Sequence, residues 1–161
     1  MVCMDSTFTE SRPIMPKDLT LITAGVLLAT LAFMAISRIF MDIDMPLWTV
    51  LASAVLFVAV IVVLFVLKMD VAVSASGVEI VYAFRKIQIP AEEIIDLRKG
   101  ELGDIRNYAN WNLKGVKHRS FTCIGDDFGV AFKLLGKRVV VFSTTTPDEA
   151  FEAISSIRKE E

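Results

Sequence analysis

The chain has 161 residues, of which 54% are hydrophobic, and its 17 basic and 19 acidic side chains give a net charge of −2. This near balance gives no reason to expect nucleic acid as a partner. The hydrophobic excess lies almost entirely between residues 19 and 67, and mixed polarity returns from residue 69 onward. We therefore expect an N-terminal tail at 1–18, a membrane segment at 19–67 and a separate domain at 68–161.

Two runs in the membrane segment, residues 19–37 and 47–67, contain no charged residue. As helices, both are about long enough to cross a hydrocarbon core of ~30 Å. A chain this short could not bury two such helices in a soluble fold, and the first run is longer than the apolar part of a typical signal peptide. Asp42, Asp44 and Pro46 lie between the runs and favour a tight turn. We expect a hairpin of two transmembrane helices.

Basic residues near the ends of the hairpin indicate its orientation. Most of them flank the two outer ends, namely Arg12, Lys17, Lys68, Arg85 and Lys86, whereas the connection carries only Arg38. Positive charge accumulates on the cytoplasmic side of membranes. We expect a multi-pass protein of the plasma (inner) membrane with both termini in the cytoplasm.

Small residues recur along both apolar runs, at Gly25, Ala29 and Ala32 in the first and at Ala52 and Ala59 in the second. Such spacing lets helix backbones approach closely. The sequence predicts either packing within the hairpin or homo-oligomerisation through this seam. Neither run contains an ionisable residue, which argues against a transporter or channel.

The domain at 68–161 is predicted to be mainly β. Segments rich in β-branched and aromatic residues occur at 69–75, 78–84, 86–89, 94–99, 119–124, 128–135 and 138–144. Ser76 and Gly77 form a plausible hairpin turn between the first two. These short connections predict about seven antiparallel strands.

A single C-terminal helix should follow the strands. Thr146 is a candidate N-cap, Pro147 occupies the first helical position, and Glu149 could complete a capping box. Phe151, Ile154 and Ile157 then recur on one face, which could cover an open end of the sheet.

Four segments of this domain carry a family resemblance: IPAEEII at 89–95, RNYANWNLK at 106–114, DFGV at 127–130 and TPDE at 146–149. In this order they resemble bacterial and archaeal pleckstrin-homology-like (PH-like) membrane proteins of uncharacterised role. Ala109 and Asn112 stand where that family's loop usually has glycines. The resemblance covers roughly residues 69–160. It implies a small barrel-like β-sandwich capped by a helix, without known catalysis, and it does not imply phosphoinositide binding.

The sequence offers little for catalysis. His118 is the only histidine, and it lies between Lys117 and Arg119, so a solvated edge residue is expected. The sequence contains no Cys/His cluster for a metal and no glycine-rich loop before the last helix. Cys3 and Cys123 are expected to be free thiols. We expect no enzyme activity, no metal and no cofactor.

One local pattern could bind a ligand. The candidate residues are Arg106, Tyr108, Trp111, Lys114, Lys117 and Arg119, in a stretch from 105 to 125 that contains no acidic residue. Bases interleaved with aromatic rings suit anionic lipid headgroups or a partner protein. Single-stranded nucleic acid is a weaker alternative. The rings could instead pack into the core while the bases remain solvated.

These observations leave three functional hypotheses. The first is a membrane-anchored, non-enzymatic PH-like interaction module that scaffolds or helps assemble a membrane protein complex, with another membrane protein or itself as partner. The second is an anionic-lipid-sensing domain at the membrane surface. The third is an accessory subunit that modulates a transporter.

Overall fold

The structure, a computed structural model, describes residues 6–40, 46–105 and 117–158. The chain divides into two compact units. One comprises Met15–Leu67, and the other comprises Met1–Ile14 together with Lys68–Glu161. The first unit is helical, and the second contains all the described strands.

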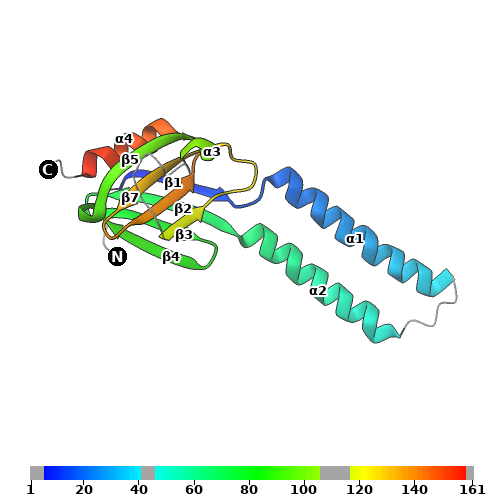
Figure 1. The fold of residues 1–161 in the computed structure, drawn as a ribbon. Coiled ribbons are helices and arrows are strands. Elements are labelled where there is room, and N and C mark those ends of the chain that lie inside the picture. The colour runs from blue at the N-terminus through cyan, green and yellow to red at the C-terminus, as the bar shows by residue number, and fades with distance from the viewer. Residues whose placement is uncertain (1–5, 41–45, 106–116, 159–161) are drawn as a thin grey trace. The chain divides into compact units, whose positions relative to one another are not determined.

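The helical unit consists of α1 (Lys17–Phe40) and α2 (Leu47–Val66), which pack against each other (Figure 1). The helices have 24 and 20 residues, or about 36 and 30 Å at 1.5 Å per residue. Both are long and apolar enough to span a membrane. No residue of α2 is buried, so this helix is not the covered core helix of a soluble fold. The predicted pair of long apolar helices is confirmed.

The small-residue seam does not join the two helices, and the prediction of packing within the hairpin through this seam is wrong. Gly25, Ala29 and Ala32 are exposed, and so are Ala52 and Ala59. The partly buried positions include larger residues at heptad-like spacing: Leu27, Leu31 and Met34 on α1, and Phe57, Ile61 and Leu64 on α2. The buried positions of α1 are Thr20, Ala24 and Ser37, so the small residues of the predicted seam lie on the exposed faces of the helices.

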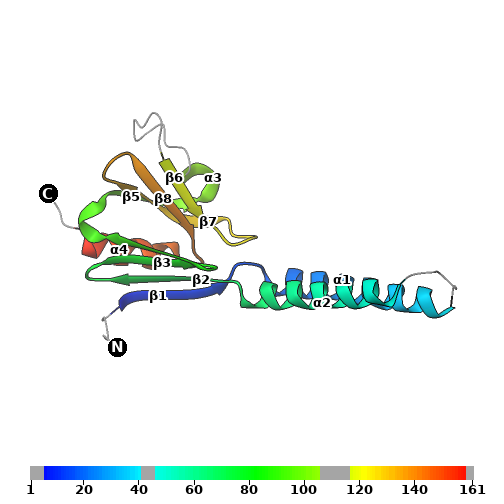
Figure 2. The ribbon, with the colours of Figure 1, turned by 90° about the horizontal axis from the view of Figure 1, so that it is seen from below.

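The second unit is a β-sandwich of two four-stranded sheets (Figures 1 and 2). In chain order its elements are β1 (Ser6–Pro13), β2 (Lys68–Ser74), β3 (Gly77–Tyr82), β4 (Arg85–Pro90), the 3-10 turn η1 (Ala91–Glu93), β5 (Ile94–Glu101), α3 (Leu102–Ile105), β6 (Lys117–Phe121), β7 (Phe128–Leu134), β8 (Arg138–Ser143) and α4 (Pro147–Ile157). Sheet A has the order β1-β2-β3-β4, and sheet B has the order β5-β7-β8-β6. The predicted mainly β domain with a C-terminal helix is therefore present.

Strand β1 comes from the segment that the sequence assigned to a tail. It runs antiparallel to β2, with Glu10 opposite Val71 and Arg12 opposite Met69. Residues directly opposite each other in a ladder share a face, and Val71 and Met69 are buried. Glu10 and Arg12 therefore lie on the inward face. Charged residues at inward positions remove the hydrophobic alternation by which a strand is recognised.

Two local features refine the predicted topology. The β2–β3 turn is Ala75–Ser76, one residue before the predicted Ser76–Gly77, and Gly77 pairs with Ser74 as the first residue of β3. Gly77 has a φ of +143°, and a Cβ there would lie 2.1 Å from the Ile89 carbonyl oxygen, so this position requires glycine. Strand β6 is parallel to β8, with Arg119 opposite Val140. The other described pairings are antiparallel. The prediction of a wholly antiparallel sheet is thus wrong at β6.

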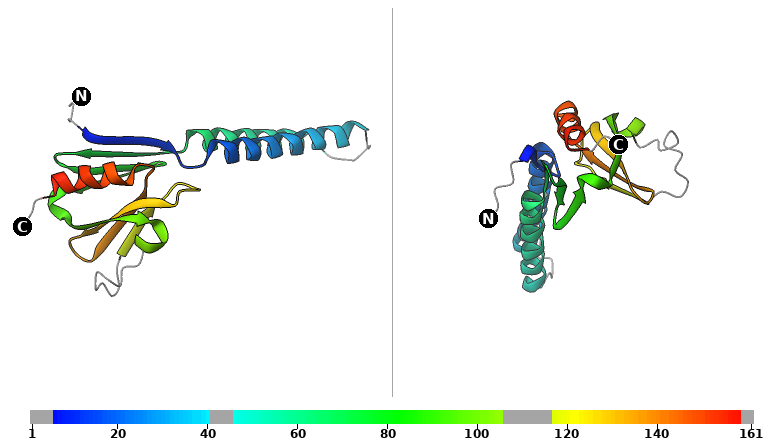
Figure 3. Two further views of the ribbon diagram at one scale, coloured as in Figure 1. Left: turned by 90° about the horizontal axis from the view of Figure 1, so that it is seen from above. Right: turned by 90° about the vertical axis from the view of Figure 1, so that its left-hand side faces the viewer.

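The main core lies between the inward faces of the two sheets. Val71, Val73 and Ile80 of sheet A and Phe132 and Phe142 of sheet B are fully buried. Helix α4 adds Ala150 and Ile154, and it packs against β1, β2, β3, β5 and β7 (Figure 3). A smaller cluster on the opposite face of sheet B joins α3 to β7 and β8.

Helix α4 begins at the predicted position but without the predicted capping box. Thr146 is the N-cap and Pro147 follows it, yet the Thr146 side chain makes no capping hydrogen bond. Instead, the Thr144 hydroxyl accepts a hydrogen bond from the Thr146 N–H at 3.1 Å. The turn is thus fixed by a side chain that lies earlier in the chain.

Candidate functional site

An open groove separates β4 from β6, the edge strands of the two sheets. A cavity of about 250 Å³ lies between them, and a neighbouring cavity of about 500 Å³ shares Ile87 and Arg119 with it. We call this continuous feature the β4–β6 groove. Its principal residues are Arg85, Ile87 and Ile89 of β4, Lys117 and Arg119 of β6, Leu134 of β7, Arg138 and Val140 of β8, and Glu93 of η1.

The cations of sheet B occupy inward-facing strand positions. Phe121 of β6 lies opposite Phe142, and both belong to the core. Two residues earlier, Arg119 lies opposite the buried Val140. Since side chains alternate along a strand, Arg119 and Lys117 share the face of Phe121. The core face of β6 therefore becomes cationic toward its N-terminal end.

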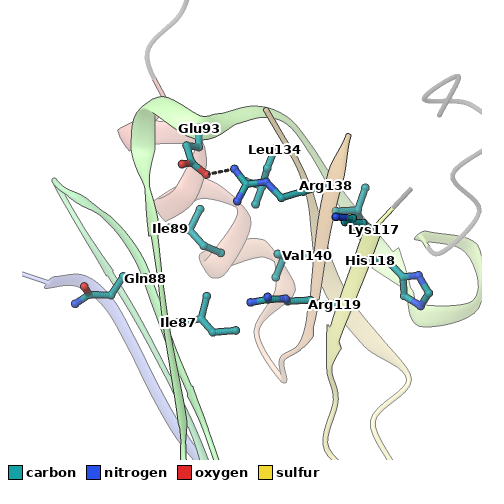
Figure 4. Close-up of a pocket in the computed structure, with 11 residues that line it drawn as sticks. Ile87, Gln88, Ile89, Glu93, Lys117, His118, Arg119, Leu134, Arg138 and Val140 are labelled. Atoms are coloured by element: carbon teal, nitrogen blue, oxygen red, sulfur yellow. Dashed lines mark hydrogen bonds and ion pairs between the residues drawn. The ribbon is translucent and has the colours of Figure 1, made fainter. Parts of the chain in front are cut away.

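Strand β4 supplies the apolar floor of the groove. Ile89 is buried and Ile87 is half-buried against the core. In Figure 4 the side chains of Arg119 and Arg138 point toward these isoleucines, while Gln88 and His118 point away. Arg85 shares the pleat face of Ile87 by alternation. The groove thus combines an apolar floor with cations on both walls.

Positive charge in the groove exceeds the negative charge available to it. Arg138 donates a hydrogen bond to a Glu93 carboxylate oxygen at 2.7 Å. Among the described residues, Arg85, Lys117 and Arg119 form no ion pair. All three side chains are exposed, so water solvates their charges and they remain accessible to a ligand. The arrangement suits a ligand that brings negative charge.

The sequence predicted part of this site. Lys117 and Arg119 lie together on the groove wall, whereas Arg106, Tyr108, Trp111 and Lys114 fall outside the described residues. The structure adds Arg85 and Arg138, which sequence analysis missed as groove residues. Arg85 and Arg138 could have been noticed because each is a basic residue at an inward position of a strand.

A second charged cluster joins β1 to the other sheet. The guanidinium of Arg12 donates to Asp126 Oδ1 at 2.5 Å and lies 3.5 Å from Glu10 Oε1. Glu10 also accepts hydrogen bonds from Thr144 Oγ1 at 2.5 Å and from Thr145 Oγ1 at 2.8 Å. We call these residues the β1 charge cluster. Each charge in it has an opposite charge or a hydroxyl beside it.

Burial and neighbouring charges shift the pKa of Arg12, within the β1 charge cluster, and of Cys123, beside it. Burial lowers the pKa of Arg12, but the hydrogen bond and charge of Asp126 outweigh this effect, so the pKa is raised overall. Burial raises the pKa of the nearby Cys123 thiol, against a lowering hydrogen bond with Ser143. Arg12 thus stays charged and Cys123 stays neutral, which suits a structural tie rather than a reactive centre.

The described residues contain no candidate metal centre. Within residues 6–40, 46–105 and 117–158, no group of three or more His, Cys, Asp or Glu side chains could hold a metal ion. Cys123 is a free, buried cysteine. The β4–β6 groove is therefore the best candidate for a functional site in this part of the chain.

Comparison of the chain with known protein families, with curated proteins and with solved structures gave no match.

Proposed function

We propose that the chain is a membrane-anchored, non-enzymatic interaction module. Its two apolar helices anchor it in the plasma membrane, and its β domain binds a partner protein and so helps to assemble a membrane protein complex. The domain would be PH-like. The two four-stranded sheets and α4 agree in general form with the sandwich and helix that the sequence resemblance implies.

The β4–β6 groove carries this proposal. Arg85, Lys117 and Arg119 face an apolar-floored groove, and no described carboxylate pairs with any of them. A protein partner can supply acidic side chains and apolar contact area at the same time. Small-molecule turnover would in addition need a base or nucleophile positioned toward the substrate. His118 points away from the groove (Figure 4), and the Glu93 carboxylate is engaged by Arg138.

In this arrangement both termini lie in the cytoplasm. Lys17 lies at the start of α1 and Lys68 follows α2 by two residues, so basic residues flank the hairpin at its outer ends. The substitution Leu135→Cys at an exposed position, in a chain lacking Cys3 and Cys123, tests this orientation. Labelling of position 135 by a membrane-impermeant maleimide in intact cells would contradict the cytoplasmic placement.

Site-specific photocrosslinking in native membranes tests the groove. A photoreactive residue at Ile87, a half-buried position of β4 that lines both cavities of the groove, should give a discrete protein adduct. Reversing the charge of Lys117 and Arg119 to Glu should remove that adduct. The same photoreactive residue at the exposed Glu152 of α4 is the control. Equal adducts from both positions, or an adduct that survives charge reversal, would contradict binding in the groove.

A second candidate function, contact with anionic lipid, is favoured by a different surface. Phe84 in the β3–β4 turn is 81% exposed and is followed by Arg85 and Lys86. The preceding residue, Ala83, donates its N–H to the Lys68 carbonyl oxygen at 2.9 Å. The turn thus lies beside the first residue of β2, close in sequence to the end of α2. An aromatic ring followed by two bases suits the interface of an anionic bilayer.

Spin labels can test this candidate in reconstituted bilayers. A label at position 84 should gain accessibility to oxygen, and lose accessibility to a water-soluble relaxant, when phosphatidylserine is added to phosphatidylcholine nanodiscs. Leu135 is 52% exposed in the β7–β8 connection and provides a matched apolar control position. If both labels respond alike, the β3–β4 turn has no special role at the membrane.

A further inference from the structure

We propose that the occupant of the β4–β6 groove is an extended segment of a partner protein that adds to the free edge of β4 as a further strand. This segment alternates acidic and apolar residues on the face that it turns toward the groove. The inference rests on the proposed function and specifies the partner's chemistry.

The backbone of β4 has a free edge. β4 pairs with β3 on one side, from the Tyr82/Arg85 pair to the Gly77/Pro90 pair, and with no other described strand on its second side. Alternate N–H and C=O groups of an edge strand point away from its neighbour and remain available to another chain. The groove lies along this edge. A strand added there would satisfy these groups, as in other cases of recognition by strand addition.

The side chains that line the groove define the sequence of such a strand. Alternate residues of an added strand would face inward, beside Ile87 and Ile89. Across the groove they would meet Arg119, Lys117 and Arg138. Apolar residues would cover the isoleucines, and acidic residues would pair with the cations. Glu93 already shows this chemistry within the chain, since it pairs with Arg138 at 2.7 Å.

A lipid headgroup would form fewer of the interactions that this groove offers than a peptide strand would. A phosphate could pair with Arg119 or Lys117, but it offers no row of backbone donors and acceptors for the edge of β4. Ile87 and Ile89 line a strand edge rather than an enclosed acyl-chain pocket, since the groove is open. The combination of an unpaired edge, an apolar floor and cations therefore favours a peptide.

Selection from a peptide library tests this chemistry directly. Full-length chain in phosphatidylcholine nanodiscs is used to select from a display library of random linear peptides, with the Lys117→Ser/Arg119→Ser chain as counter-selection. Both residues are exposed, so the substitutions should preserve the fold. We expect enriched peptides to alternate acidic and apolar residues. Enrichment of basic peptides, or no enrichment over empty nanodiscs, would overturn the inference.

Backbone methylation of an enriched peptide then tests strand addition itself. N-methylation at alternate residues removes the donors on one edge of the peptide and keeps its charge. Two peptides are compared, one methylated at the odd and the other at the even positions. We expect the affinity of one to fall at least about tenfold and that of the other to fall much less, because only one edge of the peptide would face β4. The Lys117→Ser/Arg119→Ser chain should bind the unmethylated peptide at least about tenfold more weakly, because both cations would lose their acidic partners. Lys133→Ser, on the opposite face of sheet B, should bind it normally.

The outcomes separate this inference from the proposed function. If both methylated peptides bind like the parent peptide, strand addition is wrong, while loss of photocrosslinking on charge reversal would still support the groove as a protein site. If phosphatidylserine nanodiscs abolish peptide binding through Lys117 and Arg119, the groove is a lipid site and the peptide proposal fails. If charge reversal changes neither assay, both proposals fail together.

Discussion

Among the described residues, inward-facing charges are paired at one side of the β-sandwich, and three cations at the other side form no ion pair. On the side of β1, Glu10 and Arg12 face inward and are paired with Thr144, Thr145 and Asp126. On the side of β4 and β6, the cations Arg85, Lys117 and Arg119 also face inward. Glu93, the carboxylate that lines this groove in the described part of the chain, is already paired with Arg138. One side is closed by pairs within the chain. The other retains cations that a partner could pair.

This difference bears on why edge strands carry charge at all. Inward-pointing charges on edge strands discourage pairing between molecules, because a second strand would trap them without water. Once those charges are paired within the molecule, as in the β1 charge cluster, they also bind one sheet to the other. Cations that lack such pairs still oppose an arbitrary strand, but they accept one that brings acids. Discrimination and binding then arise from the same residues.

The largest effect should follow from breaking the β1 charge cluster. Asp126→Ala leaves the Arg12 guanidinium, whose side chain is only 18% exposed, without its closest acid. Removal of one partner from a largely buried ion pair should lower the free energy of unfolding by about 3 kcal/mol. Urea unfolding of the full chain in detergent, followed by circular dichroism, measures it.

A matched double variant sharpens this test. Arg12→Met/Asp126→Leu replaces both charges of this pair with apolar groups and should recover part of the lost stability, because the remaining Glu10 carboxylate keeps its hydrogen bonds from Thr144 and Thr145. If Asp126→Ala costs no more than an exposed substitution, the β1 charge cluster does not hold the two sheets together.

A smaller effect should appear at alkaline pH, beside the same cluster. Burial raises the pKa of Cys123 in the folded chain, so the folded state holds this proton to higher pH than the unfolded state does. The resulting stability is complete below the ordinary thiol value of about 8.5 and is lost as the thiol ionises. In linkage terms, a group whose folded pKa is raised loses its contribution as pH rises from the unfolded value through the folded one. The free energy of unfolding should therefore fall more steeply above about pH 8.5 in the wild type than in Cys123→Ala. Parallel pH profiles would contradict a raised pKa.

Loss of a cation from the β4–β6 groove should change the stability much less than loss of Asp126. Arg119→Leu places an apolar side chain beside Ile87 and Val140, so the free energy of unfolding should change by less than about 1 kcal/mol. Light scattering should show more self-association, since an inward charge has been removed from an edge. A loss of stability as large as that expected for Asp126→Ala would mean that Arg119 is a structural residue rather than a binding one.

The sequence predicted correctly those elements that depend on neighbouring residues alone. The two uncharged apolar runs became α1 and α2, and a hairpin turn formed within one residue of the predicted Ser76–Gly77, next to a glycine with positive φ. β1 was missed because its inward residues include Glu10 and Arg12, so its hydrophobic period is absent. The parallel pairing of β6 was missed because a connection, not a residue pattern, determines strand direction.

The candidate site was predictable only in part for the same reason. Lys117 and Arg119 attracted notice because they are close together in a base-rich stretch. Arg85 and Arg138 belong to other segments, and only the arrangement of the two sheets brings them to the same groove. Sequence proximity reveals one wall of such a site, whereas the opposite wall depends on the tertiary fold.

The smallest expected effect provides the reference for both sides of the sandwich. Lys86 forms an ion pair with Glu79 at 2.7 Å on the outer face of sheet A, with side chains 57% and 34% exposed. The hydrogen bond from Lys86 lowers the pKa of Glu79, so the pair stabilises the fold above the ordinary glutamate value of about 4.3 and ceases to do so as pH falls through the lowered folded value. Because water and salt screen this pair, Lys86→Ala should lower the free energy of unfolding near neutral pH by less than about 0.5 kcal/mol. The difference should vanish in acid and shrink in high salt, both measurable by urea unfolding. If this exposed pair proves as costly to break as Arg12–Asp126, burial does not distinguish the charges of this domain, and the contrast between a closed side and a receptive side loses its physical basis.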